Sequence, residues 1–450
     1  MLICLVIILV TKSCSALHEN FRYVVVMLCV AFVFIVTMAA VSKRNAHPDE
    51  YVHLDATMYY QENWLPPQID DQAIEYTYSA YGISRLNNGE IYYLLAGKFS
   101  RLVTVFQMND LFSLRFFNIF LFACILLYAA ASIPARLVAL PFILSPQVWY
   151  IFSYCGSDAF GLFLCFVAGC ELVRPRSFLN RLLDPKRERG LILALFVLCV
   201  TLALLFLLKI NYYPFIGLFY LYVMWQIFKN LESGDRKRVL ARIVLVTLFA
   251  MLLAGLRIGA DYYVNGFDRQ EKVVSMQEKM AHHWYKPSTD LHNKHVTMYM
   301  KDRGTTLRGM IEGHQWFTHS FISGFGLYGY FTIAAPEIYY ELVKWALLGF
   351  LIYIFLIIGV KGSMENRLLA LLSVCLAIAL IGASLHRSWT IDFQPQGRYL
   401  FPILPMIGIL LAKSRHLFGT GLFTLLVSQL FMLAVYSFVF IALVSIPRPL

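Results

Sequence analysis

Charged residues are scarce in this chain, since Asp, Glu, Lys and Arg together make up 14% of its 450 residues. Ordinary soluble domains carry about 25%. With 59% hydrophobic residues, a water-soluble globular protein is excluded. Apolar stretches long enough to cross roughly 30 Å of hydrocarbon recur along the chain, and each must be helical because lipid offers no partners for backbone polar groups. The sequence therefore predicts an all-α, polytopic transmembrane helix bundle.

Recognisable cysteine and zinc motifs are also missing. All of the nine cysteines except Cys14 and Cys155 lie in apolar stretches, so neither a disulfide framework nor a thiolate metal site is expected. The pairs His282-His283 and His292/His295 suggest zinc, but no HExxH motif or cysteine spacing accompanies them. We therefore do not expect a zinc site.

We predict about 11 membrane spans within a single integral membrane domain, residues 1–450. The predicted spans are 21–41, 112–130, 134–152, 157–173, 190–208, 211–228, 239–257, 338–360, 366–385, 399–411 and 420–445. The apolar stretch 2–10 precedes them. It is either a cleaved signal peptide or a cytoplasmic lead-in, and the lack of a basic start and a clear cleavage site favours the lead-in.

Short loops between alternate spans are rich in Lys and Arg, which predicts that these loops are cytoplasmic. This bias accounts for most of the net charge of +11, so nucleic acid is not an expected partner. Two long segments, 42–111 and 258–337, then lie on the extracytoplasmic face of the membrane. We call them the first and second outer segments. The stretch 90–106 in the first one is helical in pattern but too polar to span, which predicts an amphipathic helix at the membrane surface.

Two adjacent acids follow the first predicted span, in the stretch from His47 to Asp55. Pro48 is suited to starting a helix, and Asp49 and Glu50 would then lie at its positive end. Carboxylates at a membrane surface can deprotonate an acceptor hydroxyl or hold a divalent cation. The alternative is a charged helix cap that only anchors the chain at the interface.

Four short motifs then occur in order between residues 47 and 405. They are His47-Pro48-Asp49-Glu50-x-x-His53, Ser157-Asp158-Ala159, Phe325-Gly326 and Gln396-Gly397-Arg398-Tyr399-x-x-Pro402. Together they resemble a bacterial family of polytopic proteins catalogued as a domain of unknown function, which is itself similar to the GT-C glycosyltransferases.

This resemblance implies a GT-C-like fold in which a polyprenyl-phosphate sugar donates its sugar on the outer face of a bacterial inner membrane. The acceptor would be a cell-surface glycan or a lipid-linked molecule. The resemblance also implies that an acid of the first outer segment, Asp49 or Glu50, is the base or holds Mg²⁺ or Mn²⁺. The motif residues His47, His53 and Gln396 would then contact substrate, as would Tyr399.

Donor phosphate requires a cation, and Arg398 is the first candidate because a guanidinium can bind two phosphate oxygens at once. The alternative is an interfacial arginine that reaches toward lipid head groups. Lys209, at a turn between two spans, is the second candidate, or an ordinary turn lysine. Asp158 begins a span, where it either caps the helix or orients Arg398, Lys209 or substrate.

The second outer segment contributes further candidates for substrate binding. His314 and Trp316 lie in it, and Trp284 and Trp316 are suited to an interfacial belt or a sugar-stacking surface. Glycines from 324 to 329 predict a re-entrant or broken helix. His386 lies in the stretch that leads to the Arg398 motif and is expected to form part of the same wall.

The function that this pattern favours is a membrane glycosyltransferase that uses a polyprenyl-phosphate donor. A flippase or transporter of a lipid-linked sugar is the alternative, although such proteins place ionisable residues near the bilayer midplane, where this sequence has almost none. A third possibility is a non-enzymatic assembly partner. The sugar, the acceptor and the linkage are not encoded in any recognisable motif.

Overall fold

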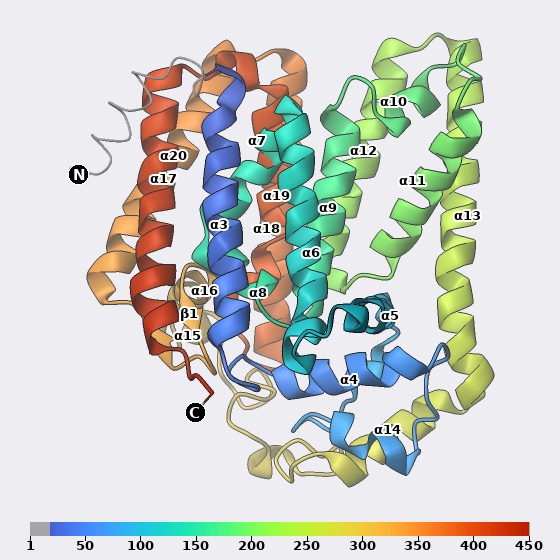
Figure 1. Ribbon diagram of the computed structural model, residues 1–450, viewed down its shortest axis with the longest axis vertical. Helices are drawn as coiled ribbons and strands as arrows, with labels where there is room; N and C mark the ends of the chain where they lie inside the picture. Colours follow the sequence, from blue (N-terminus) through green and yellow to red (C-terminus); the bar gives the residue numbers. More distant parts are fainter. Residues whose placement is uncertain (1–18, 450) are drawn as a thin grey trace.

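The computed structural model describes residues 19–449, so the apolar stretch 2–10 lies outside the described residues. The described chain is a bundle of long helices with short helices gathered at one end (Figure 1). Its only strands within residues 19–449 form one two-stranded hairpin. The prediction of an all-α membrane fold is therefore confirmed.

Six of the described helices are long and apolar enough to cross a membrane. They are α3 (Arg22–Val41), α6 (Asp110–Ala131), α13 (Ser233–Asn265), α17 (Glu337–Lys361), α18 (Met364–Thr390) and the span Gly421–Leu443, which covers most of α20 (Thr420–Tyr436) and a π-helical turn, η9 (Ser437–Leu443). Each coincides with a predicted span. Their outward-facing apolar side chains match lipid, because no other solvent would tolerate so many of them.

The other five predicted spans are shorter or broken helices. Helices α7 (Ile133–Ile143) and α8 (Pro146–Phe152) are bent by 98° at their junction, and together they would make a seventh crossing. Helices α9 (Ser157–Val173), α11 (Leu191–Phe206), α12 (Tyr213–Asn230) and α19 (Ile403–Lys413) stand where the remaining four were predicted. Almost every side chain of α9 is buried, so its apolar sequence reflects protein packing as much as lipid.

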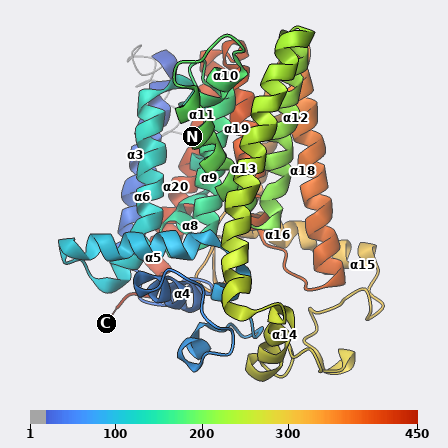
Figure 2. The same cartoon turned by 90° about the vertical axis from the view of Figure 1, so that its right-hand side faces the viewer.

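The two ends of the bundle differ in the way the sequence predicted (Figures 1 and 2). Helices α4 (Glu50–Glu62), α5 (Ile91–Val103) and α14 (Arg269–Met280) lie together at one end. Helix α10 (Phe178–Leu183), in one of the short basic loops, lies at the opposite end. Both outer segments thus share one face of the molecule, which we call the outer end.

The predicted surface helix at 90–106 is present as α5 followed by the 3-10 turn η4 (Thr104–Phe106). It runs crosswise to the long helices, as Figure 2 shows. Three apolar side chains near its end, Leu102, Val105 and Phe106, are at least 70% exposed. A helix lying flat in the interface would bury such side chains among lipid head groups. Two 3-10 turns, η2 (Gln72–Thr77) and η3 (Arg85–Asn88), precede it.

The second outer segment is built from short elements. Helix α13 continues past the predicted span end to Asn265, and α14, η6 (Leu291–Asn293), α15 (Leu307–Glu312) and α16 (Trp316–Gly324) follow. A re-entrant or broken helix was expected around the glycines, but α16 ends at Gly324 and a hairpin follows. Its strands are β1 (Leu327–Tyr328) and β2 (Ile333–Ala334), paired antiparallel. Gly326 and Gly329 have positive φ values, which disfavours continued helix there.

Candidate functional site

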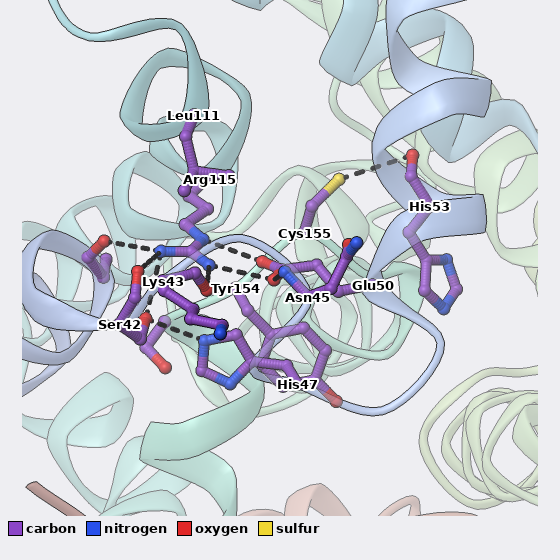
Figure 3. A network of polar contacts seen from close by, with 12 residues as sticks. Ser42, Lys43, Asn45, His47, Glu50, His53, Leu111, Arg115, Tyr154 and Cys155 are labelled. Atoms are coloured by element: carbon purple, nitrogen blue, oxygen red, sulfur yellow. Dashed lines mark hydrogen bonds and ion pairs between the residues drawn. The ribbon is translucent and has the colours of Figure 1, made fainter. Parts of the chain in front are cut away.

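The two adjacent acids of the first outer segment, Asp49 and Glu50, lie in different surroundings. Glu50 is fully buried, and both of its carboxylate oxygens are held by Arg115 of α6, at 2.7 Å from Nε and 2.9 Å from Nη2 (Figure 3). The backbone N–H of Asn45 donates a third hydrogen bond to Glu50, at 3.0 Å. Arg115 also donates to the Ser42 carbonyl, at 2.8 Å. This pair ties the loop after α3 to α6.

Asp49, in contrast, has a side chain that is 42% exposed. Its backbone is left-handed, with φ 55°, a conformation that costs energy for most residues and that often occurs at functional sites. The nearest cation is Arg85 of η3, whose Nη2 lies 3.7 Å from Asp49 Oδ2. Of the two acids, therefore, only Asp49 is accessible to a ligand.

A second acid, Asp158, lies in the first turn of α9 and is paired with two cations. Its Oδ1 is 2.7 Å from Lys209 Nζ, and its Oδ2 is 3.8 Å from Arg398 Nη1. Lys209 precedes the turn η5 (Ile210–Tyr212), and Arg398 lies in η7 (Gly397–Leu400). The side chains of Lys209 and Arg398 are 25% and 14% exposed, so both keep a surface for a ligand.

His53 of α4 joins these two groups into one cluster. Its ring is buried and shares a 2.7 Å hydrogen bond with the Tyr93 hydroxyl. Burial lowers the pKa of His53 well below its usual range, and the positive charges of Arg85, Lys209 and Arg398 lower it further. Three cations from distant parts of the sequence therefore lie close enough to His53 to keep its ring neutral.

Positive and negative charges nearly balance in this group. Arg85, Lys209 and Arg398 face the carboxylates of Asp49 and Asp158, which leaves a net charge of +1 for these five residues, and the nearby carboxylate of Glu90 offsets it. Burial alone would lower the pKa of Arg398, but Tyr399, Asp158 and other nearby acidic groups raise it. The guanidinium therefore stays charged. We call these five residues the cation cluster.

Arg85 was not among the residues that the sequence singled out. Its only distinguishing feature in the sequence is a positive charge in an acidic segment, which is common on protein surfaces. The fold gives it significance by placing η3 against the start of α4, beside Asp49.

The Gln396-Gly397-Arg398 motif contacts the end of α16, directly before the Phe325-Gly326 motif. Gly397 donates its N–H to Ser323 Oγ at 2.8 Å. A Cβ atom added to Gly397 would lie 2.4 Å from the Cα of Gly324 and 2.5 Å from the Ser320 carbonyl oxygen. No side chain fits at position 397 without moving α16. The close approach holds η7, and therefore Arg398, against the second outer segment.

The other motif residues contact neighbouring side chains of the protein. His47 is buried, shares hydrogen bonds with Ser42 Oγ at 2.9 Å and Tyr150 OH at 2.7 Å, and stacks on Tyr154. Gln396 Oε1 accepts a hydrogen bond from Arg398 Nε at 2.6 Å. The ring of Tyr399 lies 5.5 Å from the Arg398 guanidinium. Gln396 and Tyr399 thus orient Arg398, whereas His47 has no exposed surface for substrate.

Three further candidates lie elsewhere at the outer end. Trp316 is 1% exposed and donates its indole N–H to Ser388 Oγ at 2.9 Å, so its ring packs in the interior and offers no face to a sugar. His314 is exposed and lies 5.6 Å from the ring of Phe393. His386 is exposed near the end of α18. None of these three residues makes a hydrogen bond, ion pair or ring contact with the five residues of the cation cluster.

A small pocket adjoins the cluster at Lys209. Three polar side chains, Glu90, Ser157 and Lys209, line it together with an apolar wall. The apolar wall is formed by Ile91, Tyr92, Phe160, Leu207, Leu208 and Tyr212. The pocket therefore combines a charged end, with one acid and one lysine, and an apolar wall.

A divalent cation has no evident set of ligands here. Within residues 19–449 there is no group of three or more His, Cys, Asp or Glu side chains that could hold a metal ion. Both oxygens of Glu50 are occupied by Arg115, so Asp49 and Glu50 do not form a paired carboxylate site. The described residues do not fit Mg²⁺ or Mn²⁺ bound by protein ligands alone.

Comparison with models of protein families identifies a family that this chain matches. The model of a family described as predicted membrane protein (DUF2142) matches residues 77–407. No curated protein and no solved structure is significantly similar to the chain. The match contains Asp158, Lys209 and Arg398 and begins after Asp49. Because it covers well over half of the 450 residues, this chain belongs to the DUF2142 family of predicted membrane proteins.

Proposed function

We propose that this protein is a membrane glycosyltransferase that uses a polyprenyl-phosphate sugar as donor. The observation that carries the proposal is that an exposed acid, Asp49, lies at one end of the bundle beside Arg85 and near the group formed by Asp158, Lys209 and Arg398. Transfer of a sugar from a lipid phosphate needs both a base for the acceptor and positive charge for the departing phosphate.

In the proposed reaction, Asp49 accepts the proton of an acceptor hydroxyl. The acceptor oxygen forms a bond to the anomeric carbon of the donor sugar, while the bond from that carbon to the phosphate oxygen breaks. The electron pair of the broken bond stays on the phosphate. Arg398 and Lys209 neutralise the charge that develops there, and Asp158 holds both cations in position.

The polar and apolar division of the pocket beside Lys209 supports a lipid-linked donor. A phosphate bound at Lys209 would lie next to the side chains of Leu207 and Leu208, which suit the first isoprenoid units. A free nucleotide sugar has no hydrocarbon chain that could pack against this apolar wall. The acceptor is expected to approach from water, where Asp49 is accessible.

The distribution of charge supports an enzyme over a flippase. Transporters tend to hold ionisable residues near the middle of the membrane. In this protein, the fully buried Arg115 lies in the second turn of α6 and pairs with Glu50 at the outer end. The cation cluster lies at the same end.

The test is transfer of sugar from a polyprenyl-phosphate donor by purified protein carrying Asp49→Asn. This change keeps the shape of the side chain and removes its charge, and loss of a general base lowers rates roughly 10²- to 10⁴-fold. Asp70→Asn is the matched control, because Asp70 is another exposed acid of the same outer segment. Transfer by a folded Asp49→Asn protein at the wild-type rate would refute the proposed role.

A further inference from the structure

Four aromatic side chains that do not belong to the cation cluster form a patch at the outer end. The rings of Tyr81 and Tyr285 lie 4.3 Å apart, and His295 lies 5.6 Å from both Tyr285 and Trp284. Trp284 is 44% exposed, and the other three are partly exposed. We call these residues the aromatic patch.

The patch is assembled from both outer segments. The backbone N–H of His282 donates to the Ala80 carbonyl at 3.0 Å, which fixes the turn around Tyr81 against the end of α14. Gly82 fits closely at this junction, because a Cβ there would lie 2.8 Å from backbone atoms of Gln277 and Ala281. The arrangement of the rings is thus held by backbone contacts.

Polar groups border the rings. Asp392 is 8% exposed and accepts hydrogen bonds from the Tyr81 hydroxyl at 3.0 Å, from Thr297 Oγ1 at 3.0 Å and from Gln394 Nε2 at 2.6 Å. His295 Nδ1 in turn shares a 2.8 Å hydrogen bond with the Thr297 hydroxyl. Ring faces and fixed polar groups therefore occur side by side.

The patch reaches the cation cluster on two sides. On one side, Gln394 Oε1 accepts a hydrogen bond from the Tyr399 hydroxyl at 2.8 Å, and the Tyr399 ring lies beside the Arg398 guanidinium. On the other side, Tyr81 belongs to the turn that leads to Arg85, the partner of Asp49. The patch is thus linked to Arg398 through Gln394 and Tyr399, and to Arg85 through a short turn.

We propose that the aromatic patch binds a carbohydrate, as the acceptor subsite of the transferase. Aromatic faces pack against the C–H groups of a sugar ring, and the polar edges of Trp, Tyr and His side chains can bind its hydroxyls. The patch differs from the tip of α5, where Leu102, Val105 and Phe106 are exposed and aliphatic character prevails. That tip suits lipid, whereas the hydrogen-bonded rings of the patch suit a polar ligand with a flat apolar face.

This inference rests on the proposed function, and its test needs no transfer reaction. Full-length protein in lipid nanodiscs is applied to immobilised oligosaccharides released by mild acid from the envelope of the organism that produces it. We expect wild-type protein to bind and Trp284→Ala to bind roughly 2- to 12-fold more weakly, the range measured for single aromatic contacts. Trp64→Ala is the matched control, since Trp64 is 72% exposed in the other outer segment and contacts Lys98.

The alternative occupant of the patch is the membrane itself. Nanodiscs that contain brominated lipids quench the fluorescence of tryptophans in contact with acyl chains. If the quenched fraction decreases when Trp284 is replaced by alanine, the ring lies in lipid and the acceptor subsite is refuted. Absence of oligosaccharide binding by wild-type protein, or equal binding by Trp284→Ala, would refute it as well. Loss of transfer in Asp49→Asn is measured separately. Refutation of carbohydrate binding at the aromatic patch would therefore not refute the transferase proposal.

Discussion

Glu50 and Arg115 form an ion pair in which neither side chain has any exposed surface. The adjacent acid, Asp49, has a side chain that is 42% exposed and lies 3.7 Å from Arg85. One peptide bond therefore separates an acid that holds the fold together from an acid that is accessible to a ligand. The difference allows structural and chemical effects to be tested independently.

Replacement of Glu50 by glutamine is expected to destabilise the protein. The change leaves the Arg115 charge buried without a counterion, and breaking a buried pair in this way typically costs about 3–5 kcal/mol. Thermal unfolding in detergent measures the loss, with Asp49→Asn as the matched control that should unfold close to wild type. Replacing both partners, as Glu50→Gln with Arg115→Met, should recover part of the stability. A fully stable Glu50→Gln protein would contradict this account of the pair.

Replacement of Arg398 by lysine is expected to slow transfer while the protein stays folded. Lysine keeps the charge but loses the planar group that can bind two phosphate oxygens and can donate to Gln396. The measurement is the KM for a polyprenyl-phosphate donor together with kcat. Arg387→Lys serves as the control, because Arg387 is an exposed arginine of the neighbouring α18. An unchanged KM and kcat in Arg398→Lys would show that Arg398 does not bind the donor phosphate through its guanidinium group.

Replacement of Gly397 by alanine is expected to disturb the position of Arg398. The added methyl group would meet the Gly324 backbone at 2.4 Å, and overpacking of this kind typically costs about 1–3 kcal/mol. Donor binding should weaken together with stability. Gly382→Ala in α18 is the control, since a Cβ there has no neighbouring atom within 4 Å. Equal donor affinity and stability in Gly397→Ala and wild type would show that the contact has no such role.

The two ends of the bundle are expected to face opposite sides of the membrane. Asp290 lies in the second outer segment and Arg187 lies in the loop after α10, and both are exposed. A membrane-impermeant thiol reagent applied to intact cells should label Asp290→Cys and spare Arg187→Cys. The parent protein controls for its own cysteines. Similar labelling at both positions would invalidate the assignment of sides.

Features that depend on local composition were predictable from the sequence. Continuous apolar stretches predicted α3, α6, α13, α17 and α18, because lipid requires both apolar side chains and helical hydrogen bonding. The amphipathic pattern of residues 90–106 likewise predicted α5 and η4 as a helix too polar to span. The grouping of basic loops predicted which connections share an end of the bundle.

Features that depend on contacts between distant residues were decided only by the tertiary structure. The sequence left Asp49 and Glu50 equivalent, and the choice between them depends on Arg115, which α6 brings to Glu50 from 65 positions away. The fold likewise brings Arg85 beside Asp49. The bend of 98° between α7 and α8 and the buried position of α9 depend on packing against other helices. Hydropathy cannot report such packing, because an apolar side chain is equally suited to lipid and to a protein interior.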